Sequence, residues 1–282
     1  MTTNDWAFET KQIHAGFAID ESTGATALPI YQTSSYAFSD TGQAAGRFAL
    51  RELGPIYTRL NNPTTDSVAA RIAALEGGVG GLLVSSGQSA TALSLLALAV
   101  AGNNIVASPS LYGGTVTLLK NTLGRLGIET RFVPDPLDAK AWRTLADDKT
   151  VAFFGESIPN PRGDILDIEP IATAAHEVGV PLIVDNTVAT PYLVRPIEWG
   201  ADIVVHSATK YLGGHGTSIA GAIVDSGAFD FSSQPERFPL YNTPDESYHG
   251  LVYARDLGVG GALGANLAFL LRIQTLVNRD LG

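Results

Sequence analysis

Hydrophobic residues occur along most of this chain in short runs, and stretches with helical spacing separate the runs. Four stretches have the spacing of helices, at residues 88–100, 115–126, 139–146 and 171–178. Seven runs rich in β-branched and aliphatic residues have the character of buried strands, at residues 82–85, 105–108, 130–133, 151–154, 182–184, 203–205 and 222–224. Because helices lie between most of the strands, the pattern predicts an α/β fold with a mostly parallel, doubly wound sheet.

An earlier helix is predicted to begin directly after Asn62. The Asn-Pro pair at this point supplies an N-cap residue and a proline at the first helical position. Val68, Ile72 and Leu75 then recur on one face, until Gly77 ends the helix. This helix therefore precedes the first predicted strand.

The remaining segments complete the predicted organisation. Residues 1–61 show little of either the helical or the strand period, and we expect an extended arm that packs on another surface. Residues 62–259 contain every predicted strand and form the predicted large domain. Residues 260–282 begin a further helix, and we expect its leucines to be exposed: Leu263, Leu267, Leu270 and Leu271.

Composition narrows the classes of function. The net charge of −10 disfavours nucleic acid as a partner, since its phosphates would be repelled. The chain has no cysteine, which excludes thiolate catalysis, disulfides and cysteine-ligated metals. The N-terminus lacks the apolar segment of a secretion signal, and the apolar stretch 260–273 is too short to cross a bilayer. We therefore expect a cytoplasmic protein.

Chemically distinctive residues follow three of the predicted strands. Ser86 and Gly87 open a helix after the first strand, Asp185 follows the fifth, and Lys210 lies shortly after the sixth. Each alone has a common structural explanation: a turn, a cap or a solvated surface lysine. Ligands of doubly wound sheets bind beyond the carboxyl ends of the strands, so these residues are expected to meet at one site.

Together these residues predict a pyridoxal-5′-phosphate (PLP) site. A carboxylate such as Asp185 keeps a pyridine nitrogen protonated, and an amine such as that of Lys210 condenses with an aldehyde to form a Schiff base. Hydroxyl groups and backbone amides at a helix start bind a phosphate. No metal is expected, because His176-Glu177 resembles the start of a zinc-protease motif but lacks the second histidine.

Several further motifs give the chain a family resemblance. From about Phe8 to its C-terminus it resembles the PLP-dependent enzymes of Cys/Met metabolism, which include cystathionine γ-synthase, methionine γ-lyase and the homoserine-ester sulfhydrylases. The motifs that carry the resemblance are Tyr57-Thr58-Arg59, Asn62-Pro63-Thr64, Ser86-Gly87-Gln88, Leu111-Tyr112-Gly113-Gly114, Asn160-Pro161, Val184-Asp185-Asn186-Thr187 and Ser207-Ala208-Thr209-Lys210-Tyr211. The resemblance implies the fold of type I PLP-dependent transferases.

The resemblance also implies roles for these residues. Lys210 would attach the cofactor and move protons, Asp185 would pair with the pyridine nitrogen, and Tyr112 would stack on the ring and assist catalysis. Tyr57 and Arg59 would reach the phosphate of a neighbouring subunit, which implies a site shared across a dimer, within a homotetramer. The implied cofactor-binding residues are Tyr57, Arg59, Ser86, Gly87, Gln88, Tyr112, Asn160, Asp185, Ser207, Thr209 and Lys210.

Within the family, four segments resemble the branch that uses O-acetylhomoserine and sulfide: residues 8–16, 29–33, 46–57 and 236–250. This branch forms homocysteine and acetate by γ-replacement, a step of methionine biosynthesis. Two alternatives within the family stay open, a methionine or cystathionine γ-lyase and a synthase that uses O-succinylhomoserine. A third alternative is a truncated, non-catalytic fragment of the PLP fold.

One departure from the family concerns length. Family members continue into a C-terminal domain that would be largely absent from residues 1–282, so that residues 260–282 would begin the helix that leads to it. In the family that domain supplies the arginine that binds the α-carboxylate of the substrate. No residue of this chain is assigned that role.

Overall fold

The computed structural model describes residues 6–20 and 22–277. At its centre is a seven-stranded sheet with the strand order β1-β7-β6-β5-β4-β2-β3. The strands are β1 (Gly80–Val84), β2 (Asn104–Ala107), β3 (Glu129–Phe132), β4 (Thr150–Glu156), β5 (Leu182–Asp185), β6 (Ile203–His206) and β7 (Gly221–Asp225). All seven predicted strands are confirmed, and each boundary lies within two residues of the prediction.

Strand β7 is the exception to the parallel arrangement. Strands β3, β2, β4, β5 and β6 pair in parallel with their neighbours, whereas β7 runs antiparallel to both β6 and β1. The connection between β6 and β7 contains turns and bends but no helix, so the chain returns directly beside the strand it left. The prediction of a mostly parallel sheet is confirmed.

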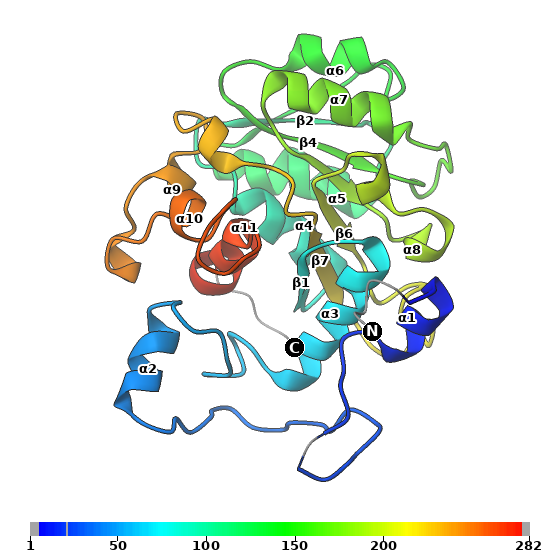
Figure 1. Cartoon of the computed structure of the whole chain (residues 1–282). Helices are drawn as coiled ribbons and strands as arrows, with labels where there is room; N and C mark the ends of the chain where they lie inside the picture. The colour runs from blue at the N-terminus through cyan, green and yellow to red at the C-terminus, as the bar shows by residue number, and fades with distance from the viewer. Residues whose placement is uncertain (1–5, 21, 278–282) are drawn as a thin grey trace.

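Helices cover both faces of the sheet (Figure 1). Ile203 and Val205 belong to the large core that also includes residues of α4 and α11, whereas Val204 packs with α3 on the other face. The α-helices are α1 (Phe8–His14), α2 (Thr41–Phe48), α3 (Pro63–Glu76), α4 (Gly87–Leu96), α5 (Gly113–Thr117), α6 (Ala139–Leu145), α7 (Ile168–Val178), α8 (Thr190–Leu193), α9 (Pro239–Asn242), α10 (Tyr253–Asp256) and α11 (Ala268–Arg272). The π-helical segments are η2 (Leu118–Leu123) and η6 (Ile273–Val277), and the 3₁₀ segments are η3 (Pro196–Trp199), η4 (Phe231–Ser233) and η5 (Glu246–Tyr248).

Helix α3 begins and ends as its sequence predicts. The side chain of Asn62 accepts a hydrogen bond from the backbone N–H of Thr64 at 2.9 Å, and Pro63 is the first helical residue. Gly77 ends the helix at φ +86°, in the left-handed region where a side chain would be strained. The helix then packs against β1 and β7.

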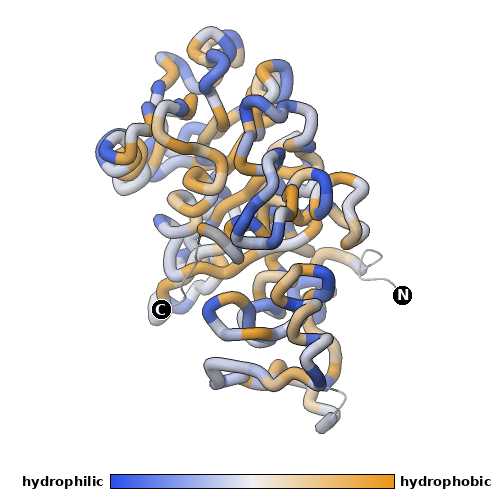
Figure 2. The backbone as a smooth tube through the Cα atoms, turned by 90° about the vertical axis from the view of Figure 1, so that its left-hand side faces the viewer, coloured by the Kyte–Doolittle hydropathy of each residue, from blue (hydrophilic) through white to orange (hydrophobic). Residues whose placement is uncertain are grey.

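The N-terminal segment, described from residue 6 to residue 61 except for residue 21, contains two short helices that the periodicity did not predict. Neither α1 nor α2 contains a buried residue, and helices of seven and eight residues are too short for a sustained hydrophobic repeat. Both views place the segment beneath the sheet (Figures 1 and 2). The division of the chain into an arm, a large domain and a linking helix stays a prediction.

The segment that ends the described chain is better packed than expected. Leu270 and Leu271 are buried in the main core, and Leu263 and Leu267 pack against it, so the prediction of exposed leucines is wrong. The physical reason is that α11 lies against the same core as β1 and α4. Across residues 6–20 and 22–277, no helix has both the length and the apolar character needed to cross a membrane.

Candidate active site

The carboxyl ends of the parallel strands bring several predicted site residues to one edge of the sheet. Ile183 and Val205 point into the core that includes α4. Side chains alternate along a strand, so Asp185 and Ser207, two residues further on, belong to the same face. The site is therefore built on the α4 face of β5 and β6.

A turn at the start of α4 lies directly against Ser207. The hydroxyl of Ser86 accepts a hydrogen bond from the backbone N–H of Ser89 at 3.1 Å and caps the helix. A Cβ atom on Gly87 would lie only 2.6 Å from the Cβ of Ser207, so glycine is required for this approach. The first N–H groups of a helix have no partner within it, and the turn therefore suits an anion such as phosphate.

Asp185 is held by the residue two positions further along. The Oδ1 atom accepts hydrogen bonds from the backbone N–H of Thr187 at 2.9 Å and from its hydroxyl at 2.5 Å. The hydroxyl oxygen of Thr187 in turn accepts the N–H of Ser207 at 2.7 Å. Burial raises the pKa of Asp185, and the two bonds from Thr187 and the charge of His206 oppose that rise. A buried carboxylate of this kind suits a cationic partner such as a protonated pyridine nitrogen.

Lys210 lies in a tight turn at the end of β6. Its N–H donates to the carbonyl of Ser207 at 3.1 Å, and its own carbonyl accepts the N–H of Gly214 at 2.8 Å. Its neighbour Thr209 closes the loop, since its hydroxyl donates to the carbonyl of Ala220 at 3.1 Å and accepts the N–H of the same residue. The hydroxyl proton of Thr209 is thus used within the loop, although the sequence predicted a phosphate contact for this residue.

Tyr112 is fixed at the start of α5 by a bond to β4. Its backbone N–H donates to Oε1 of Glu156 at 2.7 Å, and its side chain is 49% exposed. A Cβ atom on Gly114 would lie 2.6 Å from the tyrosine ring, so this glycine allows the ring to fold against the helix start. The amide of Gln88, from the start of α4, lies 3.3 Å from the hydroxyl of Thr115 and links α4 to α5.

Glu156 is a site residue that the sequence analysis missed. It ends β4 opposite Asp185 in the parallel register, and its carboxylate accepts the backbone N–H groups of both Tyr112 and Asn160. Burial, and then the charge of Asp185, raise the pKa of Glu156 to about 8. The rule that strand ends carry the site could have found this residue, because it lies two residues beyond the predicted strand 151–154.

A second buried network lies on the opposite face, behind the site. Oε1 of Glu76 lies 2.6 Å from Nε2 of His206 and accepts the amide of Asn186 at 2.9 Å. The amide oxygen of Asn186 accepts the hydroxyl of Ser157 at 2.8 Å. Glu76 and His206 are both fully buried. The network ties α3 to the ends of β4, β5 and β6.

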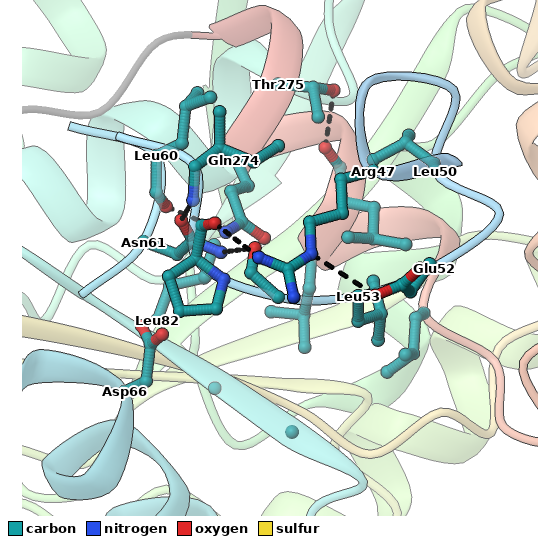
Figure 3. Close-up of a pocket in the computed structure, with 18 of the residues that line it drawn as sticks. Arg47, Leu50, Glu52, Leu53, Leu60, Asn61, Asp66, Leu82, Gln274 and Thr275 are labelled. Atoms are coloured by element: carbon teal, nitrogen blue, oxygen red, sulfur yellow. Dashed lines mark hydrogen bonds and ion pairs between the residues drawn. The ribbon is translucent and has the colours of Figure 1, made fainter. Parts of the chain in front are cut away.

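Tyr57 and Arg59 lie outside this cluster, on the segment that precedes α3. Their neighbours Ile56 and Leu60 line a pocket of about 370 Å³ together with Gly80, the first residue of β1 (Figure 3). The turn of Ser86 and Gly87 at the start of α4 (the phosphate turn) follows the other end of β1. The guanidinium of Arg59 lies 5.9 Å from the ring centre of Tyr57.

Within residues 6–20 and 22–277, no three His, Asp or Glu side chains are grouped so as to hold a metal ion. His176 instead lies 2.9 Å from Oδ2 of Asp202.

The carboxyl edge of this sheet carries the turn that holds Lys210 (the lysine turn), the buried carboxylate of Asp185 and the start of α4. These are the features of a PLP-dependent enzyme of the α/β class. The family model described as Cys/Met metabolism PLP-dependent enzyme matches residues 9–279, and the chain belongs to this family.

Individual relatives agree with the family match. An O-acetyl-L-homoserine sulfhydrylase of Corynebacterium glutamicum is 48% identical over 99% of this chain and 63% of its own length. One of Leptospira meyeri is 51% identical over 97% of this chain and 62% of its own length. One similar solved structure is that of a Campylobacter jejuni protein described as an O-acetylhomoserine (thiol)-lyase, which contains N′-pyridoxyl-lysine-5′-monophosphate. The two structures superpose with a TM-score of 0.86 at 39% sequence identity, and the match covers 97% of this chain and 70% of that one. The chain thus spans less than two thirds of the length of these curated relatives.

Proposed function

We propose that PLP binds at the carboxyl edge of the sheet, with Lys210 as its point of covalent attachment. The observation that carries the proposal is the position of Ser207, which contacts the phosphate turn at Gly87, the Thr187 bridge to Asp185 and the backbone of Lys210. When bound, PLP supplies an electron sink that stabilises negative charge on the substrate carbon beside the amine.

Each residue of the cluster has a task in this proposal. The N–H groups of Gly87 and Gln88 and the hydroxyl of Ser207 orient the phosphate. Asp185 keeps a proton on the pyridine nitrogen, and Nζ of Lys210 moves protons between neighbouring carbons of the substrate. The ring of Tyr112 covers the site from the start of α5.

The proposed reaction is the exchange of acetate for sulfide on O-acetyl-L-homoserine, which gives homocysteine. The support for this substrate is the set of relatives named as O-acetyl-L-homoserine sulfhydrylases, together with a homocysteine synthase of Schizosaccharomyces pombe that is 50% identical over 98% of the chain. The reaction would place the protein in methionine biosynthesis. A cytoplasmic location stays a prediction.

The substrate is tested by competing assays on the purified protein reconstituted with PLP. We expect acetate release from O-acetylhomoserine with sulfide to exceed succinate release from O-succinylhomoserine with cysteine, compared as kcat/KM. The Lys210→Ala variant is the control for acetate or succinate release that does not depend on the proposed catalytic lysine. A preference for the succinyl ester, or production of α-ketobutyrate from methionine, would assign a different reaction of the same family.

We further propose that the site is shared between two subunits of a dimer, within a tetramer. Tyr57 is 44% exposed, and Ile56 and Leu60, on either side of the Tyr57–Arg59 motif, line a pocket with the start of β1, at the end of the strand away from the turn at Gly87. The arginine would therefore serve the phosphate of a second copy.

Mixed dimers test the shared site. An Arg59→Ala chain and a Lys210→Ala chain should each be nearly inactive, and mixing them should restore part of the activity. In a mixed dimer one of the two sites receives both an intact Arg59 and an intact Lys210. If subunits exchange and no activity returns, Arg59 acts within its own chain.

A further inference from the structure

Glu156 contacts more of the proposed site than its position in the sequence indicates. Its carboxylate accepts the N–H of Tyr112 at 2.7 Å and the N–H of Asn160, and its side chain is almost completely buried. Tyr112 lies 44 residues earlier in the chain, at the start of a different element. One carboxylate thus connects two backbone segments that are both expected to contact a bound ligand.

Glu156 also shares its strand end with the carboxylate of Asp185. The two residues are register partners on the neighbouring parallel strands β4 and β5, and the N–H of Ser157 donates to the carbonyl of Asp185 at 2.9 Å. Two ionised carboxylates in such a position repel each other, and a buried site disfavours the second charge.

The charged and polar groups around this pair decide which carboxylate keeps a proton. Burial raises the pKa of Asp185 as well, but the two bonds from Thr187 and the charge of His206 oppose that rise and stabilise its ionised form. Glu156, on β4, faces the carboxylate of Asp185 on β5. It also lines a small pocket with a further acidic residue, Asp164. The pKa of Glu156 is raised to about 8, first by burial and then by the charge of Asp185, although the N–H groups of Tyr112 and Asn160 oppose the rise.

We propose that Glu156 is a positioning residue that anchors Tyr112 and Asn160, and that Glu156 and Asp185 together hold a single negative charge, which Asp185 carries. This inference rests on the proposed function for its consequence, because one negative charge matches the one positive charge of a protonated pyridine nitrogen. A second ionised carboxylate would leave an uncompensated buried charge beside the cofactor.

The anchoring role predicts different results for two variants of Glu156. Glu156→Gln keeps an oxygen that accepts the two N–H groups and stays neutral, as the protonated acid does. We expect it to bind PLP within about threefold of the unmodified protein, because no buried group loses its partner. Glu156→Leu has a similar volume but no acceptor, and we expect its affinity for PLP to fall by about tenfold or more.

Amide hydrogen exchange tests the anchoring without the cofactor. In the PLP-free protein the N–H groups of Tyr112 and Asn160 should exchange slowly in the unmodified chain and in Glu156→Gln, and faster in Glu156→Leu. Circular dichroism and thermal unfolding verify that Glu156→Leu is folded. Equal protection of both N–H groups in all three proteins would overturn the anchoring role, and so would a Gln variant that behaves like the Leu variant.

A carboxyl titration tests the shared charge. With ¹³C-labelled glutamate, the carboxyl carbon of Glu156 in the PLP-free protein should titrate at its raised pKa of about 8. The Asp185→Asn variant should lower this midpoint, because the charge that repels it is removed. The matched control is Asp225→Asn, which removes a buried carboxylate at the opposite edge of the sheet and should leave the midpoint unchanged.

The outcomes separate this inference from the proposed function. A normal acidic midpoint for Glu156, or a midpoint that does not respond to Asp185→Asn, would overturn the shared charge. If the protein bound no PLP at all, the proposed function would fail, whereas the exchange and titration results on the PLP-free protein would still decide the role of Glu156.

Discussion

Buried carboxylates lie in pairs at both edges of the same sheet. At the carboxyl ends of the parallel strands, Glu156 and Asp185 are register partners on β4 and β5. At the opposite edge, Asp202 precedes β6 and Asp225 ends β7, and the charge of Asp202 contributes to raising the pKa of Asp225 to about 7, after the larger effect of burial. Burial and mutual repulsion are therefore common to both edges.

The two edges differ in what their carboxylates hold. Asp202 accepts the N–H of Leu182 at 2.8 Å and contacts His176, and Asp225 accepts the N–H of Gly227 at 2.8 Å. These bonds close the local connections between strands and helices. Glu156, at the other edge, accepts the N–H groups of Tyr112 and Asn160, two of the predicted cofactor-binding residues. A raised pKa alone does not mark a functional site; the groups that the carboxylate positions do.

The largest difference between the two edges is expected when one lysine is removed from each. Lys210→Ala should abolish the visible absorption band of the PLP-treated protein and lower turnover by several orders of magnitude, because attachment and proton transfer are lost together. Lys149, which directly precedes β4 at the opposite edge, is the matched control. Lys149→Ala should leave both the absorption band and the turnover close to those of the unmodified protein.

The next contrast removes one carboxylate from each edge. Asp185→Asn should still bind PLP but lower kcat on the order of a hundredfold, since the pyridine nitrogen loses the group that keeps it protonated. Asp225→Asn retains an oxygen for the N–H of Gly227 and should keep nearly full kcat. Equal losses in the two variants, measured by acetate release, would remove the distinction between the edges.

A smaller contrast concerns the histidine–carboxylate contacts. Glu76→Ala would leave fully buried His206 without its partner and should lower the free energy of unfolding by about 3–5 kcal/mol. At the other edge the His176 side chain is 45% exposed, and His176→Ala should cost about 1 kcal/mol. Urea unfolding of the PLP-free protein measures both values, and a reversed order would contradict the assignment of the two contacts.

The smallest contrast is in the dependence of stability on pH. The raised pKa of Asp225 means that the folded protein keeps a proton that the unfolded chain has already released, between its ordinary value of 3.8 and about 7. Stability conferred by Asp225 is therefore lost as the pH rises through this window. Asp225→Asn should flatten the slope up to about pH 7, whereas Glu156→Gln should flatten it up to about pH 8. Thermal unfolding at a series of pH values checks both windows.

The sequence predicted the scaffold well, because the scaffold depends on local patterns. The β-branched runs of the strands and the Asn62 and Gly77 ends of α3 are set by residues close together in the chain. The turn residues Gly87, Asp185 and Lys210 could be named because strand ends are where α/β folds bind ligands. The structure brings all three into contact with Ser207 or its bonded neighbours.

The residues that the sequence did not predict depend on partners far along the chain. The strand-end rule could have named Glu156 as a candidate, but its contacts with Tyr112 and Asp185 join residues far apart in the chain, and no local pattern records them. The pairing of Glu76 with His206 spans 130 residues. Helices α1 and α2 were missed for another reason, since they are only seven and eight residues long and bury no side chain.

The role of Lys210 as the point of covalent attachment is tested most directly by mapping where PLP attaches. The chain has only five lysines, Lys11, Lys120, Lys140, Lys149 and Lys210, so peptide mapping can distinguish every candidate. The protein is incubated with PLP, reduced with borohydride to make the link permanent, digested and analysed by mass spectrometry. We expect a stoichiometric pyridoxyl group on Lys210 and none on Lys149. A label on another lysine, or a label spread evenly over the exposed ones, would contradict this role.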